Sequence, residues 1–388
     1  MPASPIRKLA PLAYKAEDEG VKIYRLNIGQ PDLPTPQKAL DALKEVDRKT
    51  LEYSPSQGYR SLRTALVNYY ERYQIKLSAD DIIITCGGSE AVLFAFMSCL
   101  NPGDEIIVPE PAYANYMAFA VSAGAVIRTI TTTIEEGFCL PKVERFEELI
   151  NERTKAILIC NPNNPTGYLY TQKEMNQIRD LVKKHNLYLF SDEVYREFIY
   201  TGSPYISAMH LEGIEQNVVL IDSVSKRYSE CGIRIGALIT KNEAVRKTVM
   251  KFCQARLSPP LIGQIVAEAS IEGTEAYSRE VYGEYLERRK TLIDGVNRIP
   301  GCYTPIPMGA FYTIAEIPVD NAESFAKWML TDFRLEGQTT MVTPAASFYK
   351  TPGKGLNHIR VAYVLEVPEL EKALDVLEKG LATYPGRR

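Results

Sequence analysis

Short apolar runs bounded by polar or turn-forming residues recur up to about residue 240 of the chain. Their length is typical of strands that are buried on both faces of a sheet. The stretches between most of them, such as residues 90–100 and 173–186, show the periodicity of helices. This alternation predicts an α/β fold with a mainly parallel sheet covered by helices on both faces. The runs are DIIIT (81–85), EIIVP (105–109), KAILIC (155–160), LYLFS (187–191), VVLID (218–222) and IGALIT (235–240).

The pattern changes after about residue 280. A charged helical stretch at 284–299 is followed by two apolar segments, at 303–317 and 358–364, and by a final helical stretch at 368–384. We therefore predict a large domain at residues 46–283 and a smaller α+β domain at residues 284–388. Residues 1–45 are too few to fold alone, and we expect them to form an arm that contributes to the small domain.

Composition narrows the function classes. The 388 residues are 45% apolar and 24% charged, as in an ordinary globular protein, and the net charge of −3 gives no general attraction to nucleic acid or to a membrane surface. No apolar run is long enough to span a membrane, and the N-terminus lacks the apolar core of a signal peptide. Seven scattered cysteines indicate reduced thiols in a cytoplasmic protein, and three distant histidines do not favour a metal site.

Polar residues follow five of the predicted strands, at the edge where open α/β sheets bind ligands. After residues 81–85, Gly87, Gly88 and Ser89 form a turn into a helix, where backbone N–H groups can hold an anion. The other four strands are followed by Tyr113; by Asn164 within NPNNPTG (161–167); by Asp192 and Tyr195; and by Ser223 and Lys226, with Arg234 eight residues further on.

Each of these residues has an ordinary structural explanation. The glycines can serve only the turn, Asp192 can cap a helix, the tyrosines can pack, and Lys226 can extend to solvent. All of these explanations would have to hold independently at one sheet edge, so we favour a ligand site. Pyridoxal 5′-phosphate suits the set: a turn and an arginine for its phosphate, an aromatic side chain for its ring face, polar groups for its ring heteroatoms and a lysine for a Schiff base.

The motifs also carry a family resemblance. With GGSEA (87–91), NPNNPTG, SDEVY (191–195) and SVSK…GIRIG (223–236) at these separations, the chain resembles the class I/II aminotransferases of the pyridoxal-phosphate-dependent fold type I superfamily. It is similar to the bacterial aspartate aminotransferase-like branch from NIGQPDLPTP (27–36) to HIRVAY (358–363). The resemblance implies a mainly parallel, seven-stranded-type sheet in a large three-layer αβα domain, plus a smaller α+β domain.

The resemblance also implies residue roles. Lys226 forms the Schiff base and moves the proton at the substrate Cα, and Asp192 pairs with the pyridine nitrogen. The cofactor's ring hydroxyl contacts Asn164 and Tyr195, Tyr113 stacks on the ring, and the substrate carboxylate meets Arg360, Asn164 and the backbone of Gly29. Tyr53 reaches the phosphate of a neighbouring subunit, which implies a homodimer. The phosphate is held by Gly88, Ser89, Glu90 (through its backbone N–H), Ser223 and Arg234.

The implied reaction is a ping-pong transfer of an amino group from an L-amino acid to a 2-oxo acid such as 2-oxoglutarate. A pyridoxal-phosphate-dependent lyase, which eliminates a leaving group, and a cofactor-binding regulator, for which residues 1–26 offer no DNA-binding module, are the alternatives. Some bacterial aspartate aminotransferases have a lysine where Ser89 stands, so the side-chain preference stays open between aspartate-like and broad aromatic. Arg256 is a candidate substitute cation, with Lys22 and Arg227 as weaker ones.

Overall fold

The computed structural model describes residues 7–202, 204–272 and 275–388. Its largest sheet has seven strands, and within it only β8 runs antiparallel to its neighbours. The prediction of a mainly parallel, seven-stranded sheet is therefore confirmed. In spatial order the strands are β2 (Ile82–Thr85), β8 (Gly236–Ile239), β7 (Val218–Ser223), β6 (Tyr188–Asp192), β5 (Thr154–Cys160), β3 (Glu105–Glu110) and β4 (Val126–Thr131).

The six predicted strands all form, because nearly every one of their residues is buried between two helical layers. The seventh strand, β4, was not predicted. It lies at the edge of the sheet, and only Ile127 and Ile130 of its sequence VIRTIT are buried. A strand with one exposed face has no continuous apolar run, so its signal is weaker.

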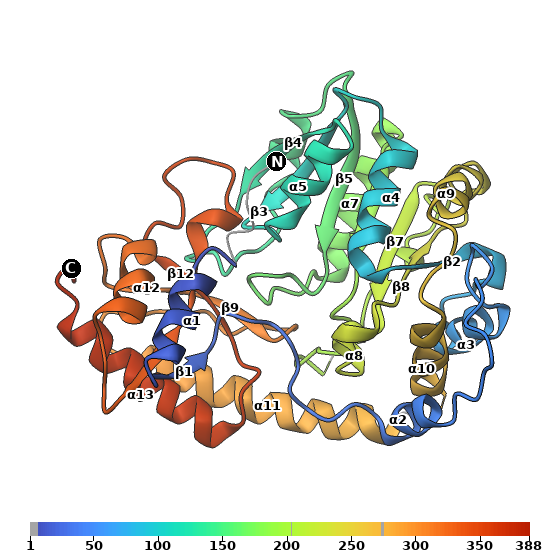
Figure 1. Cartoon of the computed structure of the whole chain (residues 1–388). Coiled ribbons are helices and arrows are strands. Elements are labelled where there is room, and N and C mark those ends of the chain that lie inside the picture. Colours follow the sequence, from blue (N-terminus) through green and yellow to red (C-terminus); the bar gives the residue numbers. More distant parts are fainter. Residues whose placement is uncertain (1–6, 203, 273–274) are drawn as a thin grey trace.

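Helices cover both faces of this sheet (Figure 1). One face packs against α4 (Gly87–Cys99), α5 (Asn115–Ser122) and α9 (Glu243–Arg256). The other face packs against α7 (Gln172–His185), α3 (Arg60–Glu71) and α10 (Leu261–Ile271). This is the predicted three-layer αβα arrangement. In the described part of the chain, no helix is both long and apolar enough to cross a membrane.

The N-terminal segment joins the C-terminal elements. Strand β1 (Lys22–Arg25) pairs in parallel with β10 (Gln338–Met341), although more than 300 residues separate them. Helix α1 (Ala10–Asp18) lies beside them (Figure 1). This pairing places the N-terminal segment beside C-terminal elements. The N-terminal arm and the domain boundaries at residues 45 and 283 stay a prediction. The other C-terminal elements are β9 (Tyr312–Glu316), β11 (Thr343–Pro344), β12 (His358–Ala362), α11 (Glu275–Arg298), α12 (Ala322–Thr331) and α13 (Val367–Thr383).

Candidate active site

A cavity of about 960 Å³ lies at the carboxyl ends of the parallel strands. Strands β2, β3, β5, β6 and β7 deliver residues to it from one side, and β1, β9 and β12 from the other. Eleven of the thirteen predicted site residues line it, so the structure brings together side chains spread over more than 300 positions. These are Gly29, Gly88, Ser89, Tyr113, Asn164, Asp192, Tyr195, Ser223, Lys226, Arg234 and Arg360.

Lys226 reaches the cavity from a single helical turn, α8 (Val224–Arg227), that directly follows β7. The hydroxyl oxygen of Ser223 accepts a hydrogen bond from the Ser225 N–H at 3.2 Å and caps this turn. The Lys226 amine donates to the backbone oxygen of Gly29 at 3.0 Å and lies 3.6 Å from the sulfur of Cys231. Among the described residues no carboxylate pairs with this amine, which leaves it available to a ligand.

A buried ion pair fixes the turn from behind. The guanidinium of Arg227 donates to both carboxylate oxygens of Asp222, at 2.9 and 2.8 Å, and the Tyr70 hydroxyl donates to the same carboxylate at 2.6 Å. All three side chains are buried. Because Asp222 and Arg227 flank the segment that carries Lys226, their pairing ties both ends of that segment to the core.

Asp192 is a buried carboxylate at the end of β6. The Tyr116 hydroxyl donates to its Oδ2 at 2.6 Å, and the backbone N–H of Val194 approaches its Oδ1 at 3.4 Å. Burial raises the pKa of this carboxyl to about 6, although the two hydrogen bonds act in the opposite direction. In the described chain no lysine or arginine forms an ion pair with it. A cationic N–H of a ligand would supply the missing partner.

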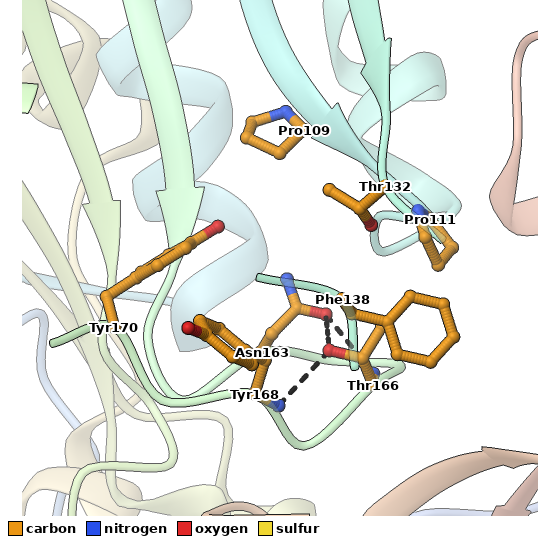
Figure 2. A pocket seen from close by; sticks show the side chains of 8 residues that line it. All are labelled: Pro109, Pro111, Thr132, Phe138, Asn163, Thr166, Tyr168 and Tyr170. Carbon is orange, nitrogen blue, oxygen red and sulfur yellow. Dashed lines mark hydrogen bonds between the residues drawn. The ribbon is translucent and has the colours of Figure 1, made fainter. Parts of the chain in front are cut away.

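The loop NPNNPTG divides its asparagines between structure and site. The Asn161 side-chain oxygen accepts a hydrogen bond from the Tyr170 N–H at 3.1 Å. The Asn163 side-chain oxygen accepts from the N–H and the hydroxyl of Thr166 at 3.2 and 3.0 Å (Figure 2). These two asparagines therefore hold the loop together. Asn164 instead faces the cavity, where its amide donates to the Tyr195 hydroxyl at 3.3 Å.

Arg360 is a buried arginine that faces the cavity from β12. It donates to the Asn164 side-chain oxygen at 3.2 Å and to the backbone oxygen of Asn27 at 2.7 Å, and its Nε has no hydrogen-bond partner among the described residues. A buried guanidinium without a carboxylate partner is suited to bind an anion. On the same side of the cavity, the backbone of Gly29 packs against the Tyr312 ring. A Cβ at position 29 would lie 1.5 Å from the Tyr312 hydroxyl oxygen, so a larger residue would collide with it.

The glycine turn after β2 and Arg234 form a second anion site. Gly88 and Ser89 lie in the first turn of α4, where helix N–H groups point outward. Arg234 donates to the backbone oxygens of Cys231 at 2.9 Å and Cys86 at 3.4 Å, so its guanidinium lies across this turn. Glycine is favoured at position 87 because φ is +76° there, and a Cβ would also displace the Arg234 guanidinium, which lies 2.3 Å from its place.

Two predicted site residues do not line the cavity. The Glu90 side chain accepts from the Cys86 N–H and pairs with Arg256 at 2.6 Å, so only its backbone is left for the predicted role. Tyr53 is 75% exposed in the single chain, and its role toward a neighbour stays a prediction.

The three candidate cations for a substrate side chain are also absent from the cavity lining. Arg256 pairs with Glu90, Lys22 pairs with Glu369 at 2.8 Å, and Arg227 pairs with Asp222. Each of the three therefore has a carboxylate partner outside the cavity lining.

Sequence reasoning missed several residues that line the cavity. Tyr116 contacts Asp192, and Tyr312 accepts from the Tyr195 hydroxyl at 3.3 Å. Tyr113 lies in the loop before α5 and Tyr116 in the first turn of that helix, and their rings meet edge to face at 5.4 Å between centroids. Neither Tyr312 nor Asn27 had a local signal that would have distinguished it from a packing residue.

Known proteins share this architecture. The chain matches the family described as aminotransferase class I and II over residues 21–377. It belongs to that family. It is 31% identical to an aspartate aminotransferase of Pyrococcus horikoshii, over 97% of this chain and 94% of the relative. It is 30% identical to aromatic-amino-acid aminotransferase 2 of Thermococcus litoralis, over 97% and 95% of the two chains.

A solved structure agrees. The aspartate aminotransferase of Thermus thermophilus with maleate superimposes with a TM-score of 0.89 at 28% identity, covering 98% of this chain and 97% of that one. The prediction of a transaminase is thereby confirmed, and the lyase and regulator alternatives are not favoured. The relatives are named after different amino acids, aspartate and aromatic ones. Their names therefore do not identify the substrate of this transaminase, which has to be inferred from its own cavity.

Proposed function

We propose that this transaminase uses pyridoxal 5′-phosphate to move an amino group from an L-amino acid to a 2-oxo acid by a ping-pong mechanism. One observation carries the proposal: a lysine amine and a buried carboxylate line the same cavity, and neither has a partner of opposite charge among the described residues. A cofactor with an aldehyde and a ring nitrogen supplies a partner for each. When bound, it provides an electron sink for the negative charge that develops at the substrate Cα.

The residues of the chain divide the remaining work. Asp192 keeps a proton on the ring nitrogen, because a buried carboxylate gains most from an adjacent N–H cation. Lys226 would hold the cofactor through its amine and, when that amine is free, would move the proton at the substrate Cα. Tyr113 covers a ring face, and Asn164 and Tyr195 bind the ring hydroxyl oxygen. Gly88, Ser89, the backbone of Glu90, Ser223 and Arg234 hold the phosphate.

Arg360 binds the α-carboxylate of either substrate, together with Asn164 and the backbone of Gly29. Among the described residues the acceptors of this guanidinium are uncharged oxygens, which supports this role, since a planar fork of donors matches a carboxylate. One anion site for the cofactor and one for the substrate then orient Cα between them, which is how a binding site lowers the entropy cost of proton transfer.

We further propose that the working unit is a homodimer, the assembly typical of this family. Tyr53 and Leu51 are 75% and 69% exposed in the single chain, and Leu257 is 49% exposed, so these side chains are accessible to a second copy. A second copy would cover such residues and place Tyr53 near its partner's phosphate site. All seven cysteines are free, which supports a cytoplasmic enzyme.

A panel of amino acids, tested against 2-oxoglutarate and pyruvate, examines the proposal. We expect equal amounts of new amino acid and new 2-oxo acid, with a change in cofactor absorbance in each half-reaction. Release of ammonia would show a lyase instead.

Borohydride should fix the cofactor to Lys226, and peptide mapping to another lysine would contradict the assignment. Sedimentation of a fully active monomer would exclude the dimer.

A further inference from the structure

One wall of the cavity comes from the N-terminal segment. Arg25, the last residue of β1, and Asn27, two positions later, both line the cavity, as expected for alternate residues of an extended chain. Met341, the register partner of Arg25 on β10, lines the same wall. Arg7 and Tyr14, before and within α1, border it as well. Figure 1 shows α1 and β1 side by side against the C-terminal elements.

The charges lining the cavity do not balance. The acidic one is Asp192, whereas the basic ones are Lys226, Arg234, Arg360, Arg25 and Arg7. The proposed function accounts for the first three of these basic side chains through the cofactor's aldehyde, its phosphate and the substrate α-carboxylate. Arg25 and Arg7 are left without a role, and both belong to the N-terminal wall.

The guanidinium of Arg25 is only partly satisfied. One nitrogen donates to Glu17 at 2.7 Å, and the other faces the sulfur of Met341 at 3.8 Å, which is a weak acceptor. The Arg25 and Glu17 side chains are 27% and 40% exposed, and an ion pair at that exposure contributes little. Close by in sequence, the side-chain oxygen of Asn27 is buried without any hydrogen-bond partner in the described chain. The wall therefore offers donors and an amide to a polar ligand group.

We propose that Arg25 binds the side-chain carboxylate of a dicarboxylic amino acid or 2-oxo acid, such as glutamate or 2-oxoglutarate, while Arg360 holds the α-carboxylate. This inference rests on the proposed function, which places the α-carboxylate at Arg360. Glu17 orients Arg25 when the cavity is empty and competes with the substrate carboxylate for it. The specificity of the enzyme is then set by a residue of the N-terminal segment, on the wall that β1 forms.

Equilibrium binding to the cofactor-loaded protein tests this without turnover. Glutarate carries two carboxylates and butyrate one, so their affinities separate the two arginines. In Arg25→Met, which keeps the apolar stem, glutarate should bind about 10- to 100-fold more weakly because a hydrogen bond to a charged group is lost. Butyrate should bind as in the wild type. Lys22→Met is the matched control, since Lys22 lies on the same strand but pairs with Glu369 outside the cavity.

Glu17→Gln should act in the opposite direction. Removing the competing carboxylate should tighten glutarate binding several-fold and leave butyrate unchanged. Glu17 is partly exposed, so this variant should fold even if Arg25→Met does not. Arg25→Lys, which keeps the charge, should recover part of the glutarate affinity.

Steady-state kinetics give a second readout. Arg25→Met should raise KM for glutamate and leave the kcat/KM for alanine and phenylalanine unchanged. Three results would overturn the inference: unchanged glutarate binding in Arg25→Met, equal weakening of glutarate and butyrate, or a selective loss with phenylalanine, which would assign the wall to apolar side chains. A protein that binds glutarate through Arg25 but transfers no amino group would contradict the proposed function and support this inference.

Discussion

Asp192 and Asp222 are buried carboxylates on neighbouring strands of one sheet, yet their environments are opposite. Burial raises the pKa of Asp192 to about 6, and no lysine or arginine in the part of the chain that the structure describes pairs with it to offset this. Burial acts on Asp222 in the same direction, but Arg227, Arg196 and the Tyr70 hydroxyl outweigh it and lower the pKa. A buried charge that the chain itself neutralises belongs to the structure, and one that it leaves without a partner marks a ligand site.

The arginines show the same contrast. Arg227 lies over the Tyr69 ring at 4.0 Å and pairs with Asp222, whereas Arg360 lies over the Tyr312 ring at 4.5 Å and has only uncharged oxygen acceptors. Both are buried. Residue type and burial are therefore alike, and the presence of a carboxylate partner separates the structural arginine from the one that faces the cavity.

The largest expected effect is on activity in Lys226→Ala. Removing the amine should reduce kcat/KM by at least about 10²–10⁴-fold, the range for loss of a general acid–base, with loss of the covalent attachment adding to it. The free energy of unfolding of the cofactor-free protein should change little, because Lys226 forms no ion pair in the described chain. Urea unfolding and half-reaction kinetics measure the two quantities. A variant with near-normal turnover would contradict the role.

At the neighbouring position, Arg227→Met should mainly lower the stability of the protein. It leaves Asp222 buried without its ion-pair partner, which should cost about 3–5 kcal/mol of unfolding free energy. Urea unfolding of the cofactor-free protein measures this loss. The double variant Asp222→Asn/Arg227→Met is the control, and it should recover much of the stability. If Arg227→Met cost less than about 1 kcal/mol, the pair would not be the anchor of the α8 turn.

Arg360→Ala should weaken substrate interaction by about 2–5 kcal/mol, the range for truncating one member of a buried charge pair. KM should rise, and the affinity for the cofactor should stay nearly constant because the phosphate site is elsewhere. Arg246→Ala is a suitable control, since Arg246 pairs with Asp81 at 2.9 Å outside the cavity. Normal turnover of Arg360→Ala at low amino-acid concentration would exclude the α-carboxylate role.

The smallest of these effects is a pH dependence at Asp192. The pKa of Asp192 is about 6 in the folded cofactor-free protein and 3.8 in an unfolded chain. The protonated carboxyl therefore contributes to the free energy of unfolding below pH 3.8, and this contribution is lost as the pH rises through 6. Asparagine does not titrate. Asp192→Asn should therefore gain about 2 kcal/mol of unfolding free energy relative to the wild type between pH 4 and 7.

Asp222→Asn provides the contrast, again in the cofactor-free protein. The lowered pKa of Asp222 confers stability above pH 3.8 that is lost only as the pH falls further. Its difference from the wild type should therefore stay constant between pH 5 and 7. Two parallel curves for Asp192→Asn and the wild type over that range would contradict the raised pKa.

The sequence by itself determined the sheet and most of the cavity. Strands buried on both faces are continuous apolar runs, and parallel strands end at one edge, so Asp192, Asn164 and Lys226 could be placed together before any coordinates. The edge strand β4 had no such run, because only two of its six residues are buried.

Only the tertiary structure decided which charges are neutralised. Arg227 and Lys226 are adjacent in sequence, but one points to Asp222 and the other to the cavity, a difference that depends on packing around a single helical turn. Arg25 joins the cavity because β1 pairs with β10, more than 300 residues away. Local patterns report the burial of an element's own faces. They do not show which residue of a distant segment will lie beside a buried charged side chain. That neighbour decides whether the charge is neutralised within the protein or is left to bind a ligand.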